Sequence, residues 1–290
     1  MIKKILYCMI VTLYIATALG NTIVYNLRIA ETTLKIPLKE GTTHNYLGAA
    51  TTVAQVRNQL DTTKLIFFSE LGTFVYYAQS YFIRLDAAFA NARIRTNGVT
   101  LSQKTETDDL LFTGGYGHTF NDQMSGTFSA LAGFPTHGVR RIDTAYFGYA
   151  HYSLGAQVDF AYLFNKYLNS KIIIVGRGVH FFKRDASRIP LLVRLDGGNI
   201  FDIFCSYGFG PAWTKFDIGY DGTLFSNFIQ TNIQVPLYIR NSFYATCTHS
   251  FKIKEHSSAC MLGISYSFDN KPEIGFKNII TAWASLWMRF

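Results

Sequence analysis

The feature that most constrains the fold is a long stretch of strict alternation between apolar and polar side chains. In residues 146–164 the even positions, from Tyr146 to Phe164, carry no charge, whereas the odd positions include His151, Gln157 and Asp159. Successive side chains of a β-strand point to opposite faces, so this period of two predicts a strand with one apolar and one polar face. In a membrane β-barrel the apolar face would meet lipid and the polar face the interior.

The composition decides between a soluble β protein and a membrane barrel. Charged residues make up 16% of the chain and aromatic residues another 16%, whereas soluble domains are about a quarter charged. Beyond residue 20, no apolar run approaches the ~18 to 20 residues that a membrane-spanning helix needs. A helical membrane protein is therefore excluded. We expect an all-β protein, an antiparallel transmembrane β-barrel.

The N-terminus predicts export from the cytoplasm. Lys3 and Lys4 precede an apolar stretch from Ile5 to Ile15, and small residues follow at 16–20. This is the pattern of a cleaved signal peptide over residues 1–20, with a short membrane anchor as the alternative. The basic residues beyond it are scattered rather than gathered on one segment, so nucleic acid is not an expected partner.

Three cysteines lie beyond the predicted signal peptide, Cys205, Cys247 and Cys260. An odd number leaves at least one of them without an intramolecular partner. We expect all three to be small residues on a lipid or core face, although Cys247 and Cys260 could approach each other across a hairpin.

The last nine residues carry the most specific signal. Ala282, Ala284, Leu286, Met288 and Phe290 form one apolar face at a period of two, and the chain stops on an aromatic residue. This strand resembles the C-terminal recognition strand of Gram-negative outer-membrane β-barrel proteins. The resemblance implies the bacterial outer membrane as the location, with outer-membrane lipids and the barrel-assembly machinery as partners. It further implies an assembly signal at Leu286, Met288 and Phe290.

Alternating segments between residues 78 and 290 predict twelve strands, an even number, as single-chain bacterial barrels require. The count includes 187–196 and 227–240, and it places the longest outer loops near 95–107 and 135–143. Residues 21–77 remain outside this count. Within 46–60, apolar residues recur at helical spacing, which favours an N-terminal helix or plug at the periplasmic mouth or in the lumen.

The alternative for residues 21–77 is one more hairpin, built from 22–36 and 64–77, which would give fourteen strands. The predicted organisation is therefore a signal peptide at 1–20, a periplasmic or lumenal segment or extra hairpin at 21–77, and a barrel at 78–290.

The polar positions of the alternating segments predict which side chains line the interior. They include both charges and several amides, which favours a narrow channel or porin-like transporter for small solutes of unknown identity, with no cofactor and no metal site. The candidate lumen-lining residues are Arg84, Asp86, His151, Gln157, Asp159, Lys215, Asp217, Asp221, Gln230, Asn232, Gln234 and Arg240.

Two other functions remain as alternatives, a structural or adhesive barrel with a filled lumen and a lipid-active enzyme. His151, Ser153 and Asn165 superficially match the catalytic residues of outer-membrane phospholipases. At ~3.3 Å per residue, however, a single strand over 144–164 would separate Asn165 from Ser153 by roughly 40 Å. We therefore expect no enzymatic activity.

Overall fold

The computed structural model describes most of the chain beyond residue 42. The described residues are 43–57, 62–78, 80–96, 99–107, 110–134, 152–182, 198–211, 213–226, 229–230, 233–234, 238–270 and 277–290. The predicted signal peptide, residues 21–42 and the proposed strand 187–196 lie outside them. Among the described residues no helix is long and apolar enough to cross a membrane.

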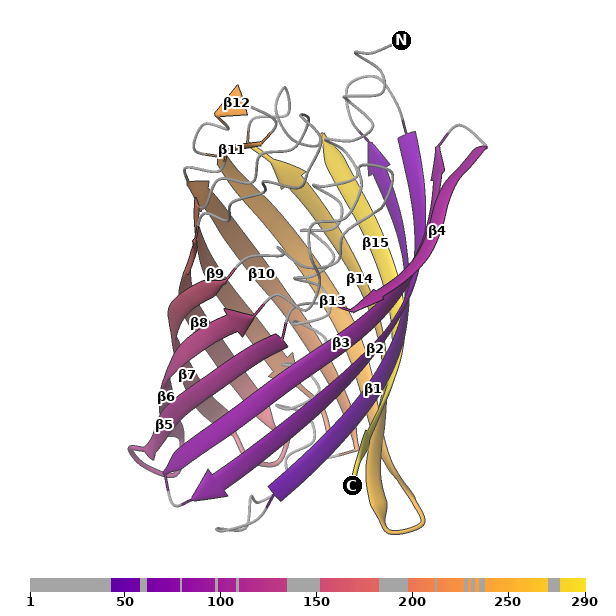
Figure 1. The fold of residues 1–290 in the computed structure, drawn as a ribbon. Helices are drawn as coiled ribbons and strands as arrows, with labels where there is room; N and C mark the ends of the chain where they lie inside the picture. The colour runs from indigo at the N-terminus through magenta and orange to yellow at the C-terminus, as the bar shows by residue number, and fades with distance from the viewer. Residues whose placement is uncertain are drawn as a thin grey trace.

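Twelve strands within the described part of the chain close into one antiparallel barrel (Figure 1). Each pairs with its neighbours in chain order, and the first strand pairs with the last to complete the ring. The wall consists of β1 (Thr43–Arg57), β2 (Thr62–Ala78), β3 (Tyr81–Thr96), β5 (Leu110–Thr119), β6 (Met124–Phe134), β7 (Ser153–Asn165), β8 (Ser170–Phe181), β9 (Gly198–Phe209), β10 (Thr214–Ser226), β13 (Tyr238–Ile253), β14 (His256–Asp269) and β15 (Asn278–Arg289). The predicted all-β barrel is confirmed.

The seam between the first and last strands closes the wall. β1 and β15 pair continuously from Tyr46 with Arg289 to Arg57 with Asn278. At the end of this seam the Phe290 amide donates a hydrogen bond to the Asn45 carbonyl. The barrel therefore has no free edge where its two ends meet.

We call the end of the barrel at which the chain finishes the lower end, as it is drawn in Figure 1. Short links join the strands there, and two of them are built on asparagine side chains. The Asn121 side chain accepts hydrogen bonds from the Gln123 and Met124 amides, and Asn165 accepts them from Tyr167 and Leu168. Such side-chain to backbone bonds favour tight turns.

The remaining strands, which are not part of the barrel wall, belong to links at the upper end. β4 (Val99–Thr107) pairs with the far half of β3, and this hairpin stands away from the barrel in Figure 1. β3 pairs with β5 only from Tyr81 to Asp86. The connection predicted near 95–107 does lie between two wall strands, β3 and β5, but 95–96 still belong to β3 and 99–107 form β4. The predicted loop at 135–143 lies outside the described residues.

The strand count was right, but its members were not. Residues 46–57 do not form the predicted helix, since 43–57 are β1, and 62–78 are β2. Wall strands thus lie upstream of residue 78, and the described residues 43–57 and 62–77 belong to the wall instead of a plug. The second strand of the alternative extra hairpin is confirmed, because residues 64–77 lie within β2.

The wall strand predicted at 227–240 is the opposite error, because it assigns to the wall residues that lie outside it. Only Tyr238 onward joins the wall, as the start of β13. Upstream of it, β11 (Ile229–Gln230) and β12 (Ile233–Gln234) pair only with each other. This segment alternates in sequence because it forms a small hairpin in the link between β10 and β13, and a hairpin strand shows the same period of two as a wall strand.

Candidate functional site: the barrel interior

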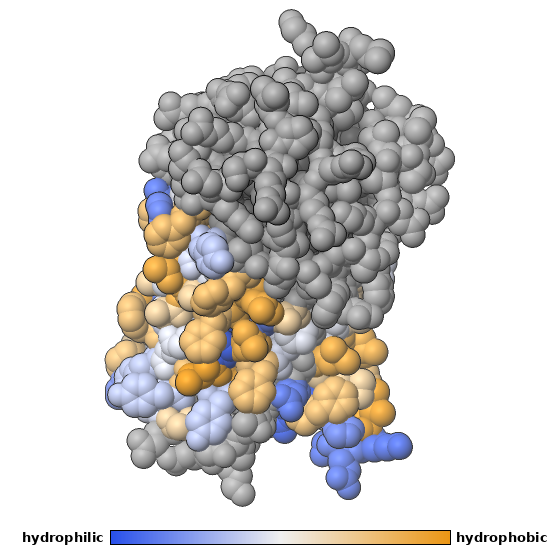
Figure 2. Space-filling view, viewed as in Figure 1, coloured by the Kyte–Doolittle hydropathy of each residue, from blue (hydrophilic) through white to orange (hydrophobic). Residues whose placement is uncertain are grey.

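The outer face of the wall is apolar. Among outward positions whose side chains the structure describes, Asp, Glu, Lys and Arg are confined to Arg57, at the upper end of β1. Leu262 and Ile264 on β14 expose 63% and 62% of their surface. Figure 2 shows apolar side chains gathered over the described lower part of the wall. Exposure of this extent on successive strands is typical of a surface that meets lipid rather than water.

Aromatic side chains cluster near both ends of this apolar surface. At the lower end Tyr207, Phe209 and Phe216 contact one another in sequence, and the rings of His256 and Phe290 lie 5.1 Å apart. At the upper end the pairs are Phe134 with Tyr152 and His180 with Phe182. Two such girdles mark the membrane interfaces of transmembrane barrels.

The inner face of β13 is polar along its whole length. Its inward positions, at every second residue, are Arg240, Ser242, Tyr244, Thr246, Thr248 and Ser250. Farther around the wall, Ile173, Val175 and Phe204 of β8 and β9 form a buried apolar cluster against which Tyr244 packs. The interior therefore has a polar stripe along β13 and a local apolar cluster near its middle.

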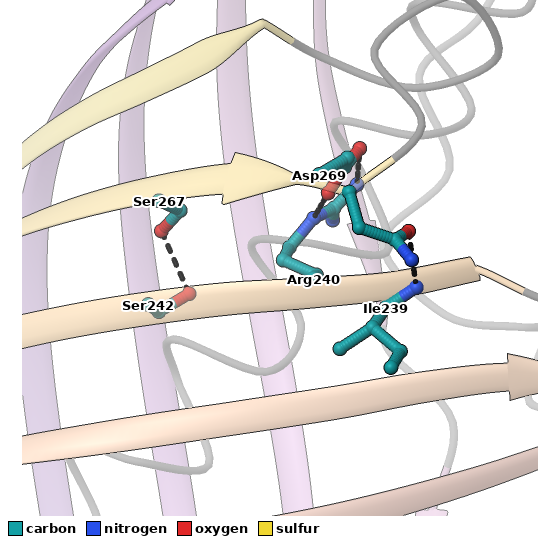
Figure 3. A network of polar contacts seen from close by, with 6 residues as sticks. Ile239, Arg240, Ser242, Ser267 and Asp269 are labelled. Carbon is teal, nitrogen blue, oxygen red and sulfur yellow. Dashed lines mark hydrogen bonds and ion pairs between the residues drawn. The ribbon is translucent and has the colours of Figure 1, made fainter.

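At the upper end the interior polar groups bind one another. Arg240 makes two hydrogen bonds to Asp269, of 2.7 and 3.0 Å, and Ser242 donates to Ser267 at 2.8 Å. Figure 3 shows these pairs bridging β13 and β14. Beside them, the Asn270 side chain accepts a hydrogen bond from the Ile239 amide. We call these residues the upper polar network.

The strand register continues this network around the wall. Thr223 lies opposite both Arg240 and Asp202, Asp202 opposite Arg177, and Arg177 opposite Gln157. Arg177 forms an ion pair with Asp202, and the Gln157 amide donates to both oxygens of Asp159 at 2.8 Å. Opposite charges on adjacent strands thus neutralise each other within the wall.

Toward the lower end the interior polar atoms are less well matched. We call Lys215, Asp217, Thr246, Thr248 and Trp283 the lower polar cluster. Lys215 and Asp217 form a 2.5 Å ion pair, and their side chains are only 3% and 2% exposed. Asp217 Oδ2, the hydroxyls of Thr246 and Thr248, and Trp283 Nε1 are buried, and none has a hydrogen-bond partner within the described structure.

Interior aromatic rings lie over glycines of the next strand. The Trp283 indole covers Gly263, where an added Cβ would lie 2.2 Å from the ring, and Trp287 covers Gly48 in the same way. Tyr244 covers Gly219. Only a residue without a side chain allows such a close approach. Large rings therefore lie against the wall instead of projecting across the interior.

The structure places the predicted lumen residues as follows. Arg84 and Asp86 form an ion pair of 2.8 Å on the inner face of β3, where the Thr73 hydroxyl also donates to Asp86. Gln157, Asp159, Lys215, Asp217, Asp221 and Arg240 also occupy inward positions of wall strands. Gln230 and Gln234 lie in the β11–β12 hairpin instead of the wall. His151 and Asn232 lie outside the described residues.

Several interior residues were missed. Arg177, Asp202 and Asp269 were not selected. In each case the period of two contained the signal, since Arg177 shares its face with Ile173 and Val175. Which charges pair could not be read from one strand, because pairing depends on the register between strands.

The enzyme alternative gains no geometric support. Ser153 begins β7 on its inner face, whereas Asn165 ends the same strand, where its side chain accepts the turn hydrogen bonds. Asn165 is thus far from Ser153 and already engaged. Cys205, Cys247 and Cys260 are free, and among the residues described no group of His, Cys, Asp or Glu could hold a metal ion.

Comparison with known proteins identifies the fold. No protein-family model matches the chain, and no curated protein matches it in sequence. An outer membrane channel from Pseudomonas putida F1 is similar in structure, with a TM-score of 0.65 at 13% identity over 87% of this chain and 97% of that one. The translocator domain of the autotransporter NalP from Neisseria meningitidis has a TM-score of 0.52 at 8% identity over 96% and 99%. The fold is that of an outer-membrane β-barrel.

Proposed function

We propose that this protein is an outer-membrane channel that lets small polar solutes cross the bilayer through the barrel. The outer face, on which Arg57 is the one charged residue at a described outward position, and the two aromatic girdles support a position across a membrane. The fold, shared with an outer membrane channel of Pseudomonas putida F1, is compatible with that role. Neither structural relative reported above is described as an enzyme.

The observation that carries the proposal is the polar stripe on β13. A barrel filled for stability alone would gain from apolar side chains that pack together, because a buried polar group without a partner costs free energy. Here every inward position of β13 from Arg240 to Ser250 is polar. Thr246, Thr248 and Ser250 have buried hydroxyls without a protein partner. A hydrated path along this strand would satisfy them.

Conductance measurements test this function. Purified full-length protein in planar lipid bilayers should give discrete current steps. Ser250→Trp places a large ring on the inner face and should lower the size of the step. Phe251→Trp is the matched control, because Phe251 is the next residue and points outward, so this variant should conduct like the unmodified protein.

The outcomes separate the channel from a filled barrel. If the unmodified protein is folded, as shown by heat-dependent mobility in gels, yet gives no current steps, then the structural or adhesive alternative replaces the channel. Equal conductance in Ser250→Trp and Phe251→Trp would mean that ions do not pass beside β13, and the polar stripe would lose its role.

We also propose that the C-terminal strand directs assembly into the outer membrane. Leu286 and Phe290 expose 44% and 52% of their surface on the outer face, and Met288 lies between them. Phe290→Ser should reduce the amount of protein inserted in cells but leave refolding of purified protein into lipid vesicles nearly unchanged. Equal loss in both assays would instead indicate a purely structural role for the ring, through its contact with His256.

A further inference from the structure

The lower polar cluster is continuous across four strands. In the wall register Lys215 lies opposite Thr248, and Asp217 lies opposite Thr246. Thr246 lies opposite Gly263, and Gly263 opposite Trp283. Directly opposed residues have Cβ atoms about 4.5–5.5 Å apart. The five side chains thus form one patch on the inner face of β10, β13, β14 and β15.

Two glycines let the side chains of this patch pack closely against the wall. Gly208 lies opposite Asp217, and an added Cβ there would lie 2.2 Å from Asp217 Oδ1 and 2.6 Å from Lys215 Cε, so the ion pair folds over it. Gly263 holds the Trp283 indole, whose Nε1 would lie 2.7 Å from an added Cβ. The indole N–H therefore lies over the residue directly opposite Thr246.

The patch presents both donors and acceptors that the protein itself does not use. Asp217 Oδ2 can only accept, Trp283 Nε1 can only donate, and the hydroxyls of Thr246 and Thr248 can do either. All four are buried and lack a hydrogen-bond partner in the described part of the protein. Native structures pair more than about 90% of buried polar groups. Four unpartnered atoms on neighbouring positions therefore point to a ligand with several hydrogen-bonding groups.

The charge of the patch narrows the chemistry of that ligand. Lys215 and Asp217 neutralise each other in a 2.5 Å ion pair, so neither a cation nor an anion meets an uncompensated opposite charge there. Hydroxyl groups both donate and accept, which matches the mixed set of atoms, and the indole offers an apolar face to the carbon skeleton. We infer that the lower polar cluster is a binding site for a small uncharged solute with several hydroxyl groups, a polyol.

This inference rests on the proposed channel function, since a solute must enter the barrel to reach the site. The experiment therefore measures both in one preparation. Ion current through the unmodified full-length protein in planar bilayers reports the channel. Its reduction by increasing xylitol, an uncharged pentitol, reports binding, provided that the reduction saturates instead of rising with viscosity.

Thr246→Val removes an unpartnered hydroxyl and keeps the shape of the side chain, and Trp283→Phe removes the unpartnered indole N–H and keeps an aromatic ring. Each should raise the xylitol concentration that gives a half-maximal reduction of the current about 2- to 12-fold, the range expected for one hydrogen bond. Trp287→Phe is the control for the indole, because Trp287 Nε1 already donates to Ser285 Oγ at 3.1 Å. Thr223→Val is the control for the hydroxyl, since Thr223 is equally buried but lies on the inner face toward the upper end.

Every outcome decides between the two claims. No current from folded protein overturns the channel and with it the site. Current without a saturating xylitol effect leaves the channel standing and overturns the polyol site. Equal loss of the xylitol effect in the site variants and the controls also overturns it, because the response would then not depend on the unpartnered atoms. Stronger saturating block by glutarate or putrescine than by xylitol would overturn the assignment to an uncharged ligand.

Discussion

Polar side chains at the two ends of the barrel interior differ in their hydrogen-bond partners. In the upper polar network side chains of β13 and β14 bond across the two strands, as Arg240 does with Asp269 and Ser242 with Ser267. In the lower polar cluster the hydroxyls of Thr246 and Thr248 and the Trp283 N–H have no partner in the described structure. Similar residues therefore join neighbouring strands at one end, whereas at the other end they form the site at which we propose that a ligand binds.

The largest expected effect comes from breaking the upper ion pair. Arg240→Ala removes the ion pair with the Asp269 carboxylate, whose side chain is fully buried. Loss of one member of a buried pair costs about 3–5 kcal/mol. The free energy of unfolding, measured by urea titration in lipid vesicles, should fall by that amount. A loss below about 1 kcal/mol would mean that the pair is not structural.

Replacing both members of each pair sharpens the comparison. Arg240→Met with Asp269→Leu should leave the free energy of unfolding unchanged or raise it by about 1–4 kcal/mol, because no charge remains buried. Its xylitol response should be retained. Lys215→Met with Asp217→Leu should be equally stable but should lose the response several-fold. Bilayer recordings and urea titrations of both double variants would reveal any reversal of this pattern.

A smaller effect is expected from the upper hydroxyl pair. Ser242→Ala leaves Ser267 Oγ without the hydrogen bond that Ser242 donates at 2.8 Å. The free energy of unfolding should fall by about 0.5–1.5 kcal/mol. Ser250→Ala, which removes a hydroxyl on the same strand that has no protein partner, is the matched comparison and should cost less.

The smallest effect on stability is expected at Thr248. Thr248→Val removes a fully buried hydroxyl without a protein partner, so the free energy of unfolding should change by less than about 1 kcal/mol and in the stabilising direction. A destabilisation of 2 kcal/mol or more, on the order of a buried group losing its partner, would show that the lower hydroxyls are structural after all.

Much of the barrel could be predicted from the sequence, because the period of two identifies which side chains face lipid. The outward face of 152–164 and the apolar face of the last strand both lie where that period places them. β1 was missed because its inward positions Gly48, Ala50 and Ala54 are small and apolar instead of polar. The structure supplies the reason at one end, where the Trp287 ring needs the space over Gly48.

The lower polar cluster could be predicted only in part. Lys215 and Asp217 were identified from the alternation, but Thr246, Thr248 and Trp283 were not selected as individual residues. Their proximity depends on the offset between β10, β13, β14 and β15, which one strand's sequence does not contain. Likewise, the absence of hydrogen-bond partners for these atoms emerges only when neighbouring side chains are placed.

The pairing of β1 with β15 also determines when the barrel can form. These strands lie at opposite ends of the described chain, yet they share a continuous register from Tyr46 with Arg289 to Arg57 with Asn278. Contacts between residues so distant in sequence slow folding, since a long loop must be closed before they are gained. The wall cannot be sealed until β15 pairs with β1, so strands that pair earlier form an open sheet. Closure is therefore expected to be the slow step of folding.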